Sequence, residues 1–148
     1  MQVIGDIVNA IINLHPWHSP VVHFPIGFTA CALLFLLGAF YRGKKSLAYA
    51  AFLALAFAAV ASAVAGILGI RDNIVRFDGG APLIPAKIIL AAILLALTAV
   101  TAVSGLRRVR ADVPWDARHR AIYLTAAVVS FCLTLVLGFL GGVILYGL

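Results

Sequence analysis

The sequence has little charge and very little acidity. Of its 148 residues 11% are charged, whereas soluble domains carry about 25%. All five acidic residues are aspartates, and none lies deep inside an apolar run. So little polar surface excludes a soluble globular domain, and the missing intramembrane carboxylate disfavours a proton-coupled carrier. We do not expect an enzyme that acts on its own.

Cysteine is scarce as well. Cys31 and Cys132 both lie inside apolar runs, so they form no disulfide framework. Basic residues outnumber acidic ones and give a net charge of +6. They lie mostly between apolar runs, however, with no basic face interleaved with aromatic residues, so no nucleic-acid partner is expected.

Long apolar runs dominate what the sequence does contain. It is 64% hydrophobic, with a mean hydropathy of +1.13. Four runs reach the roughly 20 residues that a helix needs to cross the hydrocarbon core: 21–40, 46–70, 83–106 and 121–146. Backbone polar groups in lipid must be satisfied within the chain, which favours helices. The sequence therefore predicts one integral membrane domain over residues 1–148, an all-α four-helix transmembrane bundle in the lipid bilayer.

The connections between these runs differ in charge. Those after the first and third runs hold eight basic residues: Arg42, Lys44, Lys45, Arg107, Arg108, Arg110, Arg118 and Arg120. The opposite side holds three: Arg71, Arg76 and Lys87. The positive-inside rule places the eight in the cytoplasm, so both termini and the predicted loop 71–81 face outward. Aromatic residues near the ends of the runs fit interfacial belts: Trp17, Phe77, Tyr146, Tyr41, Trp115 and Tyr123.

The N-terminal tail has its own pattern. Its apolar residues recur at helical spacing: Ile4, Ile7, Val8, Ile11 and Leu14. The residues between them include four polar ones: Gln2, Asp6, Asn9 and Asn13. This pattern predicts a short amphipathic helix that lies in the outer interface and ends at His15-Pro16.

Three of the four histidines lie where the first run begins, in "HPWHSPVVHFPIG" at residues 15–27. His23 is placed just inside the outer membrane boundary, with His15 and His18 just outside it. Imidazole in such a place binds a metal ion or haem iron, carries protons, or hydrogen-bonds neighbouring loops, and all three uses stay open. For a cofactor, His23 is the first candidate ligand, followed by His15 and His18.

Charged residues of the predicted outer loop share the side of these histidines. Arg71, Asp72, Arg76 and Asp78 would orient a histidine or bind haem propionates, or else form a solvated loop paired within itself. Lys87 is expected to extend its side chain to the interface. Ser62-x-x-x-Gly66 and Gly138-x-x-x-Gly142 predict close helix approach, inside the bundle or in a homodimer seam.

The stretch "LHPWHSPVVHFPIGF" resembles the signature of a bacterial family of small four-helix membrane proteins, a domain of unknown function. In that family a His-Pro pair precedes Val-His-Phe-Pro-Ile at the mouth of the first span. The matching residues here are His15, Pro16, Val22, His23, Phe24, Pro25 and Ile26. Relatives occur fused to cytochrome c or Rieske-type iron–sulfur domains. The resemblance therefore implies a role near electron transfer at the outer face of the bacterial inner membrane, beside a periplasmic cytochrome or iron–sulfur protein.

These observations support one leading functional hypothesis and two alternatives. The leading one is a membrane module that holds haem b or a transition metal ion through His23, His15 and His18. It would serve electron transfer or anchor a redox partner. The first alternative is a cofactor-free structural or assembly subunit of a larger membrane complex. The second is a small transporter.

Overall fold

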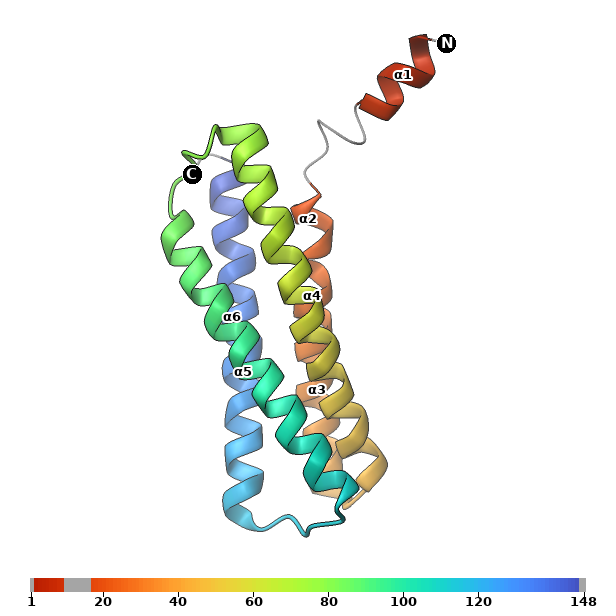
Figure 1. Ribbon diagram of the computed structural model, residues 1–148. Helices are drawn as coiled ribbons and strands as arrows, with labels where there is room; N and C mark the ends of the chain where they lie inside the picture. Colours follow the sequence, from red (N-terminus) through yellow and green to blue (C-terminus); the bar gives the residue numbers. More distant parts are fainter. Residues whose placement is uncertain (1, 10–16, 147–148) are drawn as a thin grey trace.

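Helices are the regular elements of this protein. The computed structural model describes residues 2–9 and 17–146, and it contains no strand within them (Figure 1). Its helices are α1 Gln2–Asn9, α2 His18–Val21, α3 His23–Arg42, α4 Lys45–Phe77, α5 Ile84–Arg110 and α6 Ala117–Tyr146. The predicted all-α fold class is confirmed.

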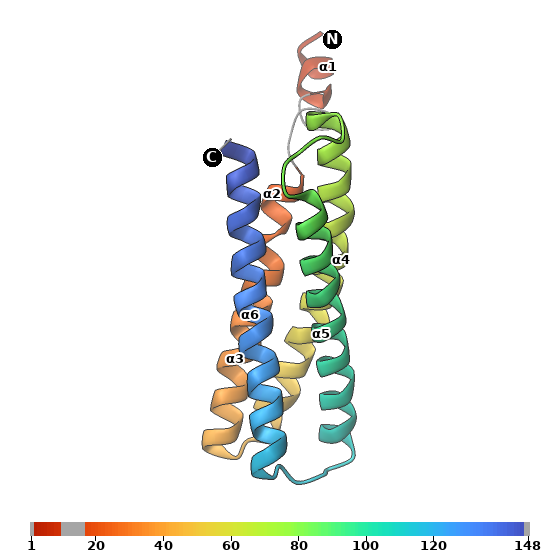
Figure 2. The same ribbon diagram turned by 90° about the vertical axis from the view of Figure 1, so that its left-hand side faces the viewer.

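The four long helices, α3 to α6, form an antiparallel bundle (Figures 1 and 2). Each packs on its neighbour in chain order, and α3 also packs on α6, so the bundle closes on itself. Each of the four is long and apolar enough to cross a membrane. The short helix α2 leads into α3 through a slight irregularity at Val22, and α2 packs on α4.

The two ends of the bundle differ in composition. One end carries α2, residues 78–83 and the end of α6, and we call it the histidine end. The other carries residues 43–44 and 111–116, and we call it the basic end. The histidines of the first span and the arginine-rich connections therefore lie at opposite ends, as the charge pattern predicts. The side of the membrane that each end faces stays a prediction.

The distribution of side chains suits lipid rather than water. Large apolar side chains point outward, among them Val100 and Phe139, which are 68% and 71% exposed. Many of the buried side chains are alanines or bear a hydroxyl, and the hydroxyls of Thr29 and Thr134 lie 3.1 Å apart between α3 and α6. Helices that meet through small residues approach closely, and outward-facing apolar groups are stable in hydrocarbon.

Aromatic rings close the basic end. Phe52, Trp115 and Tyr123 form a cluster with ring centroids 5.1 to 5.9 Å apart. Gly105 on α5 lies against it, and a Cβ there would overlap the Phe52 ring. Trp115 and Tyr123 thus pack against other rings at this end of the bundle, with Tyr123 buried, and their place in an interfacial belt stays a prediction.

The helix of the second span continues about two turns beyond the apolar run that ends at residue 70. α4 continues to Phe77, so Arg71, Asp72 and Arg76, which were predicted to be in an outer loop, lie on its last turns. The connection begins at Asp78, where left-handed backbone at Asp78 (φ 48°) and Gly79 (φ 79°) ends the helix. The length of an apolar run reflects the thickness of the hydrocarbon core, whereas a helix ends where its backbone hydrogen bonds stop.

The N-terminal helix is confirmed in part. α1 covers Gln2–Asn9 and exposes Val3, Ile4 and Ile7. Residues 10–14, the remainder of the predicted amphipathic helix, lie outside the described residues.

Candidate functional site

Two adjoining cavities lie between the helices at the histidine end. Their volumes are about 290 Å³ for the deeper one and about 340 Å³ for the outer one. Ligand sites in proteins occupy roughly 300–1,000 Å³, so each lies near the lower limit of that range. The residues that line both are His18, Val22, Gly69, Asn73, Ile84, Lys87, Leu137 and Gly138.

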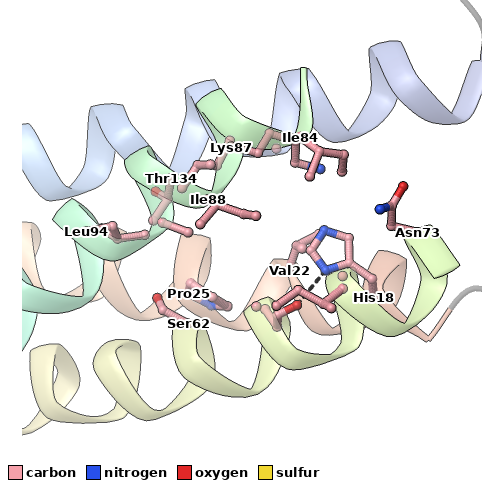
Figure 3. A pocket seen from close by; sticks show the side chains of 17 residues that line it. His18, Val22, Pro25, Ser62, Asn73, Ile84, Lys87, Ile88, Leu94 and Thr134 are labelled. Atoms are coloured by element: carbon pink, nitrogen blue, oxygen red, sulfur yellow. Dashed lines mark hydrogen bonds between the residues drawn. The ribbon is translucent and has the colours of Figure 1, made fainter. Parts of the chain in front are cut away.

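The imidazole of His18 projects into these cavities. Its Nδ1 lies 2.7 Å from the carbonyl oxygen of Ala65 on α4. A carbonyl only accepts, so Nδ1 carries the hydrogen, and in the neutral ring Nε2 keeps its lone pair. Figure 3 shows the ring across the cavity from Ile84 and Lys87.

Gly69 on α4 makes room for this ring. A Cβ at Gly69 would lie 3.0 Å from Nδ1 of His18 and 3.1 Å from Cε1, closer than ordinary side-chain contacts. A larger residue would push the imidazole away from Ala65. The position of the ring therefore depends on a helix distant from it in the sequence.

The backbone at His18 is anchored separately. Its N–H donates to Oδ2 of Asp72 over 2.9 Å, and Arg71 donates to Oδ1 of the same carboxylate over 2.9 Å. Asp72 is only 7% exposed, so this bond is shielded from water. The first N–H of α2 would otherwise have no partner within its own helix. Asp72 therefore holds α2 against α4 and fixes the backbone position from which the His18 side chain extends.

The other two candidate histidines differ from His18. His23 lines the outer cavity only, is exposed, and lies with Nδ1 3.1 Å from the carbonyl oxygen of Ser19. His15 lies outside the described residues. The structure thus brings His18 and His23 to one cavity and does not place His15.

The four charged residues predicted to support the histidines take different positions. Asp72 and Arg76 line the outer cavity. Arg71 reaches the site through its bond to Asp72. Asp78 is exposed at the end of α4 and lines neither cavity.

Sequence reasoning did not assign to the site five polar residues that line the cavities: Ser19, Ser62, Asn73, Lys87 and Thr134. Lys87 of α5 lines both, and Asn73 of α4 lines both while its Oδ1 accepts the Ala81 N–H over 3.1 Å. Ser62 lines the deeper cavity, is 7% exposed, and has no hydrogen-bond partner for its hydroxyl among the described residues. Lys87 could have been recognised as a charged residue inside an apolar run.

Of the two small-residue patterns predicted to bring helices close together, only one does so. A Cβ at Gly138 would lie 3.3 Å from Cδ1 of Ile26, which fits close helix approach. Gly66 and Gly142 would meet nothing within 4 Å, and they line the deeper and outer cavity respectively. Ser62-x-x-x-Gly66 therefore leaves space between helices instead of closing it.

The remaining nucleophilic and imidazole groups lie elsewhere. Cys31 and Cys132 are exposed and line neither cavity. His119 lies at the basic end, where Asp116 Oδ1 is 2.7 Å from its Nδ1 and accepts its backbone N–H over 2.7 Å. Within the part of the chain that the structure describes, no group of three or more His, Cys, Asp or Glu side chains could hold a metal ion.

Comparison with known proteins adds a family and no activity. A family model described as a predicted membrane protein (DUF2231) matches residues 14–147, which include all four long helices. No curated protein and no solved structure matches the chain.

Proposed function

The chain belongs to the DUF2231 family of predicted membrane proteins, and we propose that it is a membrane module that holds haem b at the histidine end of its bundle. It would serve electron transfer to, or anchoring of, a periplasmic cytochrome or iron–sulfur protein. The observation that carries this proposal is the His18 imidazole, which is fixed at Nδ1 and turns its other nitrogen into an apolar cavity.

The imidazole of His18 suits a ligand of haem iron. Histidine ligands of metals usually donate their second ring nitrogen to a carbonyl or carboxylate, which sets the tautomer and the ring orientation. The bond from Nδ1 of His18 to Ala65 supplies this support. A second ligand of the iron would come from His23, from His15, or from a second copy of the chain.

The cavity walls suit the remainder of the group. Haem presents a flat apolar macrocycle with two carboxylates at one edge. The deeper cavity is lined mainly by aliphatic side chains and glycines; Gly69 lies against the imidazole, and a Cβ at Gly66 would meet nothing within 4 Å. Lys87 and Arg76 line the outer cavity and would pair with the propionates.

Haem is favoured over a bare transition metal ion by the ligands that are present. A metal ion bound by protein alone needs three or four donor side chains, and the described residues contain no such group. Haem needs only one or two. When bound, haem iron supplies one-electron redox chemistry, while the chain binds it, orients the imidazole and excludes water.

The test is reconstitution of the purified protein with haemin. We expect the wild-type protein to give a shifted Soret band at a ratio of one haem to one chain. His18→Ala should lose that band, while its backbone bond to Asp72 is retained because only the side chain changes. His119→Ala is the matched control, since it removes an imidazole from the basic end.

The outcomes separate the hypotheses. A Soret band that survives His18→Ala would refute the assignment of this ligand. A wild-type protein that binds neither haem nor, by elemental analysis, any metal would favour the cofactor-free subunit instead.

A further inference from the structure

A third cavity, of about 320 Å³, opens at the basic end, the opposite end of the bundle from His18 and His23. It lies where the ends of α3, α4, α5 and α6 meet the connections between them. The charged residues that line it are Lys44, Lys45, Arg108, Arg120 and Asp112. Cations thus outnumber carboxylates on its wall.

Two of these cations are held in place by aromatic residues and backbone carbonyls. Arg108 lies 5.3 Å from the Trp115 ring centroid and donates through Nη2 to the Pro114 carbonyl over 2.5 Å. Arg120 lies 5.9 Å from the Phe40 ring centroid and donates through Nε to the Trp115 carbonyl over 3.1 Å. A guanidinium fixed in this way loses little further freedom when it binds an anion.

Donor capacity is left over at these arginines. Each guanidinium carries five N–H groups, and only one hydrogen bond from each is found among the described residues. Nε of Arg108 is buried and has no partner in that same set. A buried donor without an acceptor is destabilising and indicates a partner from outside the chain.

The nearby carboxylates are already engaged. Asp112 pairs with Lys45 over 2.6 Å. Asp116, which feels the charge of Arg108, is bound by the backbone and ring of His119. Lys44, Arg108 and Arg120 therefore remain for an external anion.

We infer that this cavity binds a phosphate group, with Arg108 and Arg120 donating hydrogen bonds and Lys44 adding charge. Planar guanidinium groups match phosphate oxygens in pairs. The favoured source is the headgroup of an anionic phospholipid, because the cavity lies at the ends of helices that are long and apolar enough to cross a membrane, where basic residues meet anionic headgroups. Free phosphate shares this chemistry.

The test compares two sources of phosphate and two pairs of arginines. Delipidated protein in neutral detergent is titrated with phosphatidylglycerol, with phosphatidylcholine, and with inorganic phosphate, and binding is followed by native mass spectrometry and calorimetry. Arg108→Gln and Arg120→Gln remove ligands. Arg107→Gln and Arg110→Gln are matched controls, since both arginines are exposed at the same end of α5 and do not line the cavity.

We expect the wild-type protein to bind one phosphatidylglycerol per chain. Arg108→Gln and Arg120→Gln should each lower the affinity for this lipid by about tenfold or more, and each control should lower it by less than twofold. Inorganic phosphate that follows the same pattern without the lipid would support the site and assign it to free phosphate. Binding of neither, or an equal loss in the controls, would overturn the proposal.

A spectroscopic measurement and a further variant distinguish loss of binding from loss of the fold. Near-ultraviolet circular dichroism reports whether Trp115 keeps its packing in Arg108→Gln. Lys44→Gln leaves both aromatic contacts intact and should still weaken phosphate binding severalfold; unchanged binding there would also count against the inference.

Discussion

Gly105 is the position where the smallest substitution should have the largest effect on stability. It lies on α5 against Phe52 of α4, and a Cβ there would overlap the phenyl ring. Gly27 on α3 is its control, because a Cβ there would meet nothing within 4 Å. Both glycines are inside helices, so both Gly→Ala changes gain the same helix propensity, about 1 kcal/mol.

The difference between Gly105→Ala and Gly27→Ala therefore isolates the overlap with Phe52. Overpacking costs roughly 1–3 kcal/mol, and the overlap here calls for the upper part of that range. We expect Gly27→Ala to be neutral or slightly stabilised and Gly105→Ala to unfold earlier. The assay is unfolding in mixed detergent and dodecyl sulfate, followed by far-ultraviolet circular dichroism.

A double variant tests the cause. Phe52→Leu shortens the ring that Cβ would overlap, so the cost of Gly105→Ala should shrink in that background even though Phe52→Leu is destabilising alone. Gly105→Ala that unfolds together with Gly27→Ala, or a cost that stays constant in the Phe52→Leu background, would refute the packing described for α4 and α5.

Three further predictions concern the site and the basic end. Gly66→Leu should leave the fold intact and abolish haemin binding, since a side chain there grows into the deeper cavity; undiminished Soret absorbance would contradict it. Asp72→Asn should weaken haemin binding and lower the thermal midpoint, because the carboxylate holds the N-terminus of α2, whereas Asp78→Asn, at an exposed position, should change neither. The pKa of Asp116 lies below its ordinary value of 3.8, first because the backbone N–H of His119 and then because its ring donate to the carboxylate. A carboxyl whose pKa falls on folding stabilises fully above its unfolded value and loses this as pH drops through the folded one. The thermal midpoints of wild type and Asp116→Ala should therefore differ at pH 7 and converge as the pH falls below 3.8 and through the lowered pKa; a difference in midpoint that stays constant with pH would exclude this cap.

The four spans were predictable because lipid imposes a simple constraint on sequence. A helix must present about 20 apolar residues to cross the hydrocarbon, and the four runs meet that requirement with charged residues between them. The last turns of α4 were not predictable by the same rule. Arg71, Asp72 and Arg76 extend that helix beyond its apolar run, and left-handed backbone at Asp78 ends it.

The sequence indicates the end of the bundle that holds the candidate site but not the geometry of that site. The structure places His18 and His23 at one end, and His15 lies outside the described residues. Which imidazole enters the cavity depends on Ala65, 47 residues from His18 in the sequence, and on the missing side chain of Gly69. Such contacts arise from helix packing and leave no periodic signal in the sequence.

The small residues show why the cavity itself was missed. Ser62-x-x-x-Gly66 has the same spacing as Gly138-x-x-x-Gly142, and that spacing allows helices to approach closely. Gly138 does lie against Ile26, but Gly66 opens onto empty volume. The same pattern therefore produces contact or space, according to how large the facing side chains are and how the helices cross.

The most direct measurement of the central claim is the haem content of the protein as isolated from the membranes of haem-producing cells. The pyridine haemochrome assay, normalised to protein by amino-acid analysis, gives the ratio of haem b to chain. We predict a ratio near one for the wild-type protein and near zero for His18→Ala, at equal yields of folded protein. A colourless wild-type protein that also does not bind added haemin would contradict the claim that this chain holds haem b.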